Sequence, residues 1–164
     1  MKLIVGLGNP GGEYQDNRHN VGYWAVESLL KRSLPLRGKR SLPKEFVVKK
    51  SQVFMNESGG YVKKLVEQYR AKPSDLWVIH DDLDISLGSY KIQKGKGPKL
   101  HNGVNSIERE LGTDEFWRVR VGVDNRDPEA HISGEEYVLQ DFSQEERGIL
   151  DTAIAEICKK LATS

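Results

Sequence analysis

A histidine and two asparagines lie close together near the beginning of the sequence, next to a turn that glycine residues make possible. Asn9 is part of the glycine-rich stretch at residues 6–12, and His19 and Asn20 follow shortly after it. A histidine side chain titrates near neutral pH, so its neutral form can remove a proton from water. An asparagine amide supplies both hydrogen-bond donors and an acceptor. These residue types indicate general base catalysis at a site that the turn presents.

Three more polar clusters occur where we expect strands of a sheet to end: MNESG at 55–59, HDDLD at 80–84 and HNG at 101–103. Ligands of open α/β sheets bind at the carboxyl ends of the strands. The clusters together supply a base, an orienting acid and several amides. We interpret Asp82 and Asp84 as turn residues that follow a strand. Covalent catalysis has no evident nucleophile, because no serine lies in a nucleophile elbow and the sole cysteine lies in a predicted helix.

A dinucleotide site is one alternative use of the first turn, since residues 6–11 match the pattern G-x-G-x-x-G after a strand. That fingerprint needs a helix to open inside the motif, with its amides facing a pyrophosphate. Pro10, Gly11 and Gly12 disfavour a continuous helix before about residue 20. The acidic ribose partner would have to be Glu27, which lies inside a predicted amphipathic helix. We therefore expect a turn that binds no nucleotide.

A metal site is a second alternative, because His80, Asp81 and Asp82 could act as ligands together with His19 and His101. No H-x-E or H-E-x-x-H pattern is present to support it. We expect neither a metal nor another cofactor. His131 lies in an acidic segment, and we interpret it as a surface residue.

Strands and helices alternate along the chain. Apolar runs predict strands at 2–5, 46–50, 76–79, 89–93 and 117–123. Helical spacing of apolar residues predicts helices at about 20–32, 61–69 and 104–111, and a last helix from a capping box at 143–146 to residue 161. This order predicts an α/β fold: one domain over residues 1–164, with a mixed, mainly parallel twisted sheet flanked by helices.

Length and composition fit one domain that buries its own core: 164 residues, 37% hydrophobic and 30% charged. Cys158 is the only cysteine, so a disulfide framework is excluded, and its place in a helical apolar stripe predicts a core-facing thiol. The sequence has no apolar run near 18 residues and begins with a core strand, so we expect no membrane span and no signal peptide. A reducing, cytoplasmic location follows from these features.

Basic residues are distributed unevenly, although the net charge is only +1. Residues 31–50 contain eight basic residues and one acidic residue, and residues 91–99 contain four lysines. Basic clusters are common on solvated surfaces, but two of them could also contact one polyanion.

Five motifs occur in order along nearly the whole chain. They are GLGNPG at 6–11 with Tyr14 after it, RHN at 18–20, FMN-x-SG at 54–59, HDDLD-x-x-x-G at 80–88 and HNG-x-x-S at 101–106. In type, order and spacing these motifs resemble those of bacterial-type peptidyl-tRNA hydrolases. The resemblance implies hydrolysis of the ester bond between a peptide and the 3′ ribose of tRNA.

The resemblance also implies roles for individual residues. His19 would be the catalytic base and Asp81 its partner. The substrate-binding set would be Asn9, Tyr14, Met55, Asn56, His101 and Asn102. An ester needs only an activated water and stabilisation of charge at the carbonyl oxygen, so these residues suffice without a metal.

Peptidyl-tRNA gives the basic clusters a partner. Phosphate contacts are predicted at Arg37, Lys39, Arg40, Lys91, Lys94, Lys96 and Lys99, with an affinity that falls as salt rises. We expect a monomer in the cytoplasm that needs neither a membrane nor an obligate protein partner.

The chain departs from the family pattern at Lys99-Leu100, where two glycines are usual, and in a shortened segment before Met55. The loop at 99–100 should be stiffer, which bears on closure over the substrate more than on the chemistry. The departures leave open a catalytically inactive RNA-binding relative with the same fold. A small-molecule esterase that uses the same histidine is a third possibility, but it would leave both basic clusters unexplained.

Overall fold

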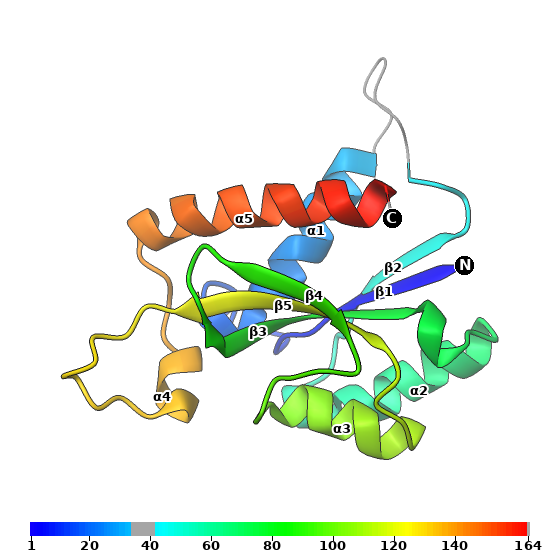
Figure 1. Ribbon diagram of the computed structural model, residues 1–164, viewed down its shortest axis with the longest axis horizontal. Helices are drawn as coiled ribbons and strands as arrows, with labels where there is room; N and C mark the ends of the chain where they lie inside the picture. Colours follow the sequence, from blue (N-terminus) through cyan, green and yellow to red (C-terminus); the bar gives the residue numbers. More distant parts are fainter. Residues whose placement is uncertain (34–41, 164) are drawn as a thin grey trace.

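Five strands form one twisted sheet in the order β2-β1-β3-β5-β4 (Figure 1). The computed structural model describes residues 1–33 and 42–163. The strands are β1 (Lys2–Gly6), β2 (Phe46–Lys50), β3 (Leu76–Ser86), β4 (Tyr90–Lys94) and β5 (Trp117–Asp124). β1 pairs in parallel with β2 and β3, β3 pairs in parallel with β5, and β4 is antiparallel to β5. The predicted mixed, mainly parallel sheet is confirmed.

Helices cover both faces of this sheet. Helix α1 (Val21–Ser33) and helix α5 (Gln144–Thr163) lie on one face, and α2 (Ser58–Gln68) and α3 (Asn102–Leu111) lie on the other (Figure 1). Side chains alternate between the two sides of a strand, so Ile4 packs with the first pair of helices, and Leu3 and Val5 pack with the second. Both faces of the central strands are therefore buried, as is usual for parallel strands covered by helices.

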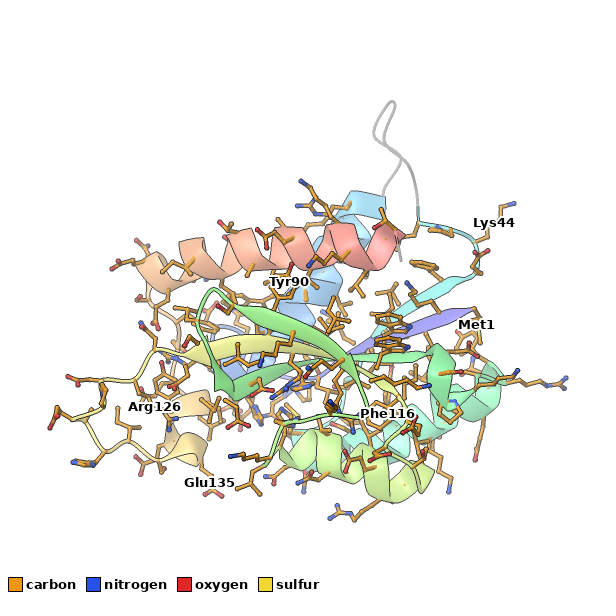
Figure 2. The ribbon with its side chains drawn as sticks, in the orientation of Figure 1. Met1, Lys44, Tyr90, Phe116, Arg126 and Glu135 are labelled. Atoms are coloured by element: carbon orange, nitrogen blue, oxygen red, sulfur yellow. The ribbon has the colours of Figure 1, made fainter. Side chains whose placement is uncertain are left out.

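Two labelled side chains mark the two layers in Figure 2. Phe116 is fully buried between the sheet and α3, and Tyr90 lies on the side of the sheet that α5 covers. The ammonium group of Lys160 from α5 lies 5.0 Å from the centre of the Tyr90 ring. None of the described helices is both long and apolar enough to cross a membrane.

The sequence locates most elements correctly, and the cap of α5 is confirmed in detail. The Ser143 hydroxyl accepts a hydrogen bond from the Glu146 amide, and the Glu146 carboxylate accepts one from the Ser143 amide. Cys158 is buried within α5 against α1, as predicted. The short helix α4 (Gly134–Val138), capped by the Ser133 side chain, was not predicted.

The expected turn at residues 80–84 is wrong, because β3 continues through this cluster to Ser86. Asp82 is buried, and its carboxylate accepts a hydrogen bond of 2.7 Å from the Arg120 side chain of neighbouring β5. The apolar run ends at Ile79, but this ion pair lets a polar stretch remain in the sheet. The polar cluster is thus part of the strand and not a loop that follows it.

Candidate active site

Three titratable side chains from three different elements meet at one point. His19 lies in a single turn of 3-10 helix, η1 (Arg18–Asn20), immediately before α1. Asp81 lies in β3, and His101 precedes the first residue of α3. The Asp81 carboxylate contacts both rings: Oδ2 is 2.8 Å from His19 Nδ1, and Oδ1 is 2.8 Å from His101 Nε2.

The proton positions on both rings follow from their partners. Nδ1 of His101 accepts hydrogen bonds from the backbone amides of Gly103 and Val104, so it carries no proton. The proton of neutral His101 is therefore on Nε2 and is donated to Asp81. His19 likewise donates from Nδ1 to Asp81, so the lone pair is on its Nε2, which has no partner among the described residues.

His19 and His101 differ in the exposed fraction of their side chains. The side chain of His19 is 13% exposed, whereas that of His101 is 4% and that of Asp81 is 2% exposed. Of the two rings, His19 is the one that solvent can reach, and its free Nε2 is a base suited to activate water.

The pKa values fit this division of roles. Burial alone would lower the pKa of His19, but the charge and hydrogen bond of Asp81 outweigh burial and raise it above its ordinary value of 6.5. Burial opposes ionisation of Asp81, yet the two histidines hold its pKa far below its usual range. Asp81 is therefore a stable anion, while His19 titrates above its usual range.

A third histidine, His80, lies behind the pair. Its ring centre is 5.0 Å from that of His101, and its Nδ1 donates to the Asp81 carbonyl oxygen at 2.7 Å. Burial, and next the nearby His101, lower the pKa of His80 to about 3. His80 is thus a neutral, fully buried group that packs behind the site.

The cluster has the composition of a metal site, since ligand atoms of His19, Asp81 and His101 lie within 4.8 Å of one another. The hydrogen bonds argue for a different use. The nitrogen of His101 that faces Asp81 carries a proton, because its other nitrogen accepts two amides. The residues present thus fit a hydrogen-bonded Asp–His arrangement better than a ligand set.

Asn9 is held in one orientation beside this cluster. Its Oδ1 accepts from the Met55 amide at 2.8 Å, which fixes Nδ2 as the other end of the side chain. Its backbone amide and carbonyl bond to the two ends of the Asn20 side chain, each at 2.8 Å. The Nδ2 group of Asn9 has no partner among the described residues, so it is a fixed donor available to a ligand.

Met55 contributes packing and its amide rather than an exposed side chain. It is 5% exposed, and a Cβ on Gly103 would lie 2.5 Å from its Sδ. Glycine at 103 therefore allows α3 to approach Met55 closely. This approach brings His101, two residues earlier, to Asp81.

The other predicted substrate-binding residues lie at the surface nearby. Asn56 and Asn102 are exposed, and Tyr14 is half-buried. The Tyr14 ring meets the exposed Phe54 edge-on, with 6.2 Å between ring centres. Asn102 is the first residue of α3, but the side chain that caps this helix is His101.

The predicted phosphate-binding lysines are exposed but are not all in one loop. Lys91 and Lys94 belong to β4, whereas Lys96 and Lys99 follow it. Lys94 lies 3.7 Å from Glu115. Arg37, Lys39 and Arg40 lie outside the described residues. Lys99 and Leu100 both have negative φ, so the loop that replaces two glycines has a backbone that ordinary residues adopt.

The sequence did not reveal three buried arginines of the described chain, Arg18, Arg118 and Arg120. Arg120 from β5 binds Asp82, and its Nη1 donates to the side chain of Gln93 at 2.8 Å. Arg18 binds Glu146. The alternation of polar and apolar residues in WRVRVGV at 117–123 was the available signal for Arg120, because it places two arginines on one face of a strand.

Comparisons with known proteins agree on one family. The family model described as peptidyl-tRNA hydrolase matches residues 3–164. A peptidyl-tRNA hydrolase from Dehalococcoides mccartyi (strain BAV1) is 41% identical, over 99% of this chain and 92% of the relative. One from Persephonella marina is 38% identical, over 94% and 86%.

Solved structures give the same result. A crystal structure of a peptidyl-tRNA hydrolase in complex with N-propanol matches with a TM-score of 0.83 and 30% identity, over 99% of this chain and 87% of that chain. A peptidyl-tRNA hydrolase from Acinetobacter baumannii matches with a TM-score of 0.80 and 29% identity, over 98% and 86%.

Proposed function

We propose that this chain, which belongs to the peptidyl-tRNA hydrolase family, hydrolyses the ester bond between a peptide and the 3′ ribose of tRNA. The observation that carries the proposal is the His19–Asp81 contact at 2.8 Å, with the free nitrogen of His19 on the solvent side. The reaction recycles peptidyl-tRNA released by ribosomes. Its products are the free peptide and tRNA with a 3′ hydroxyl.

His19 is the general base in this mechanism. Its Nε2 takes a proton from water while the water oxygen attacks the ester carbonyl carbon. The imidazolium that forms is stabilised by Asp81, which also keeps the ring in the required tautomer. When the tetrahedral intermediate collapses, the 3′ oxygen of the ribose leaves and takes the proton back from His19.

Asn9 is our candidate for the contact to the developing oxyanion. Its Nδ2 is a donor whose direction is fixed by the Met55 amide on the other end of the side chain. A donor fixed before the reaction begins stabilises charge without reorganisation. We choose Asn9 over the other predicted substrate-binding asparagines, Asn56 and Asn102, because the hydrogen bond from the Met55 amide holds its side chain.

The remaining predicted residues divide by exposure. Asn56, Asn102 and Tyr14 are accessible and are proposed to hold the peptide backbone or the 3′ end of the tRNA. Met55 and His101 are buried, so we assign them positioning roles in place of direct contact with the substrate. His101 fixes the second oxygen of Asp81, so that the first oxygen stays directed at His19.

The tRNA body is proposed to contact the exposed lysines on and after β4. Lys91, Lys96 and Lys99 are the best candidates, because Lys94 already has Glu115 nearby. Arg37, Lys39 and Arg40 remain candidates from the sequence alone. A substrate made on ribosomes favours the cytoplasm as the location, and we expect a monomer that needs no metal.

The proposal is tested with labelled N-acetylated aminoacyl-tRNA and the purified protein in the presence of EDTA. We expect release of the labelled amino acid derivative at a rate that the chelator does not change. Binding of this tRNA without release would instead favour the RNA-binding relative, an alternative for which we find no support. Loss of release with EDTA, restored by added metal, would refute the metal-independent mechanism.

A further inference from the structure

Arg18, the residue immediately before His19, is buried in a dense set of contacts. Its Nη2 donates to both carboxylate oxygens of Glu146, at 2.9 and 3.0 Å. Its Nη1 donates to the backbone carbonyls of Gln140 and Asp141, at 3.0 and 2.9 Å. The guanidinium also lies over the Tyr137 ring, 4.1 Å from its centre.

Glu146 is itself tied to two other segments. Its carboxylate accepts from the Ser143 amide in the cap of α5 and, at 3.2 Å, from the Asn125 side chain just after β5. Burial opposes ionisation of Glu146, but these bonds and Arg18 outweigh it and lower its pKa. The ion pair thus joins the His19 turn to the start of α5 and to the segment that precedes it. Arg126 and Glu135 mark this segment in Figure 2.

The other end of the same turn is also held. Asn20 is bonded at both ends of its side chain to the backbone of Asn9. At the Arg18 end, the preceding residue Asn17 also pairs with Asp141 as an isolated β-bridge. In the three-residue turn, Arg18 is therefore anchored to the cap of α5 and Asn20 to the backbone of Asn9. His19, between them, is the residue whose ring is directed to Asp81.

We propose that Arg18 is a positioning residue for catalysis, which acts by clamping the His19 turn to the cap of α5. This inference rests on the proposed role of His19 as base. An error of 1 Å in the position of a catalytic group can cost about 100-fold in rate. A looser turn would therefore slow the reaction through His19, without any contact between Arg18 and the substrate.

A purely structural role is the competing explanation, and the chain contains a matched control for it. Arg118 in β5 is also buried, pairs with a carboxylate (Glu108) and donates to two backbone carbonyls (Asp114 and Phe116). Its guanidinium also lies over an aromatic ring, 4.2 Å from the centre of Phe116. The two clamps use the same kinds of contact, although Arg18 binds both oxygens of Glu146 and Arg118 binds one oxygen of the more exposed Glu108. The Arg118 clamp joins α3 to β5 and does not include the His19 turn.

The experiment compares Arg18→Lys with Arg118→Lys in the full-length protein. Lysine keeps the charge but cannot form the same set of bonds. We expect both changes to lower Tm. Only Arg18→Lys should lower kcat, by about 10-fold or more, with KM within about threefold of wild type.

The pH profile adds a readout that general destabilisation would not change. The titratable groups that contact the His19 ring are Asp81 and His101, with His80 behind them. If the turn loosens, Asp81 raises the pKa of His19 by less than in wild type. The acidic limb of the kcat profile then moves to lower pH in Arg18→Lys. Arg118→Lys should keep the wild-type limb.

Equal kcat and equal pH profiles in the two variants, measured on folded protein, would overturn the inference. If Arg18→Lys does not fold, Glu146→Gln and Glu108→Gln provide the same comparison with a smaller perturbation. A wild-type protein without hydrolase activity would refute the proposed function itself, which is a separate result from an Arg18→Lys variant that keeps full activity.

Discussion

One carboxylate shared by two histidines is the central feature at the scale of residues. His101 has its proton fixed on the side of Asp81 by two backbone amides, so it acts as a donor. His19 has no such restriction on its outer nitrogen and is more exposed. The two rings are therefore chemically distinct although both are 2.8 Å from the same group.

Replacing Asp81 by asparagine tests the origin of the His19 basicity. Asp81→Asn removes the negative charge that raises the pKa of His19, so the acidic limb of the kcat/KM profile should move to lower pH. The rate at the plateau should fall by about 100- to 10,000-fold, because tautomer control and stabilisation of the imidazolium are both lost. A pH profile from initial rates measures both effects. An unshifted limb would show that another group titrates there.

Replacing Asn9 tests the oxyanion contact. Asn9→Asp keeps the oxygen that accepts from the Met55 amide but removes the Nδ2 donor. We expect kcat to fall by about 100- to 1,000-fold, which is typical of the loss of one oxyanion donor. Asn102→Ala is the matched control, for which we expect mainly a higher KM. Steady-state kinetics that show a larger kcat loss for Asn102→Ala would reassign the contact.

Close packing of two helices positions the site at the scale of elements. Gly59 of α2 faces α3, and a Cβ there would lie 2.2 Å from the carbonyl oxygen of Ser106. The Ser106 hydroxyl receives a bond from the Gly59 amide and donates to the Asn56 carbonyl. The α2–α3 pair thus carries Asn56 and His101 into the site together.

Two adjacent glycines of α2 should respond in opposite ways to alanine. Gly59→Ala forces backbone atoms of α3 away and should destabilise the fold by about 1 to 3 kcal/mol. In Gly60→Ala the added Cβ meets no atom of the described residues within 4 Å, and the change should stabilise the helix by up to about 1 kcal/mol. Thermal unfolding of the two variants measures the difference. Equal shifts in Tm would contradict the close α2–α3 contact.

Strands and helices with an apolar pattern were predicted well from the sequence. Segments whose buried side chains are polar were predicted less well. Strand 117–123 was found at Trp117–Asp124, but β3 runs seven residues past its predicted end, through His80 and Asp81. The reason is the Asp82–Arg120 pair, whose partners lie 38 residues apart in sequence. A single sequence does not show which distant charges meet. The same limit hid the Arg18–Glu146 pair.

The sequence motifs name candidate site residues but do not show how deeply each side chain is buried. The His19 ring contacts Asp81, and the backbone of Asn9 binds the side chain of Asn20, the residue after His19. Met55 and His101 lie nearby but are buried, because Gly103 lets α3 approach closely. Their orientation depends on helix packing, which the motifs do not encode.

The distribution of charge is what matters at the scale of the whole molecule, since the net charge is only +1. Lys96 and Lys99 are exposed on the segment between β4 and α3, directly before His101. Helix α5, with Lys159 and Lys160, lies on the opposite face of the sheet (Figure 1). We therefore predict that tRNA binds on the side that carries Lys96, Lys99 and His101.

Neutralising Lys96 and Lys99 together should reduce the salt dependence of tRNA binding. Each phosphate contact to single-stranded or duplex nucleic acid contributes about 0.7 to 0.9 to the slope of log K against log salt, so the slope should fall by about 1.5. Lys159→Gln with Lys160→Gln is the control and should leave the slope unchanged. Measuring tRNA binding by both variants at several salt concentrations gives the two slopes. A smaller slope for the Lys159 and Lys160 variant, with an unchanged slope for the Lys96 and Lys99 variant, would place the tRNA interface on the α5 side.

Single-turnover hydrolysis by wild type and His19→Ala tests whether His19 is the general base. Both proteins are mixed in excess with labelled N-acetylated aminoacyl-tRNA in EDTA, and binding of the same tRNA is measured in parallel. We predict that both proteins bind the tRNA and that only wild type releases the label at an appreciable rate. Release by His19→Ala at the wild-type rate would contradict it.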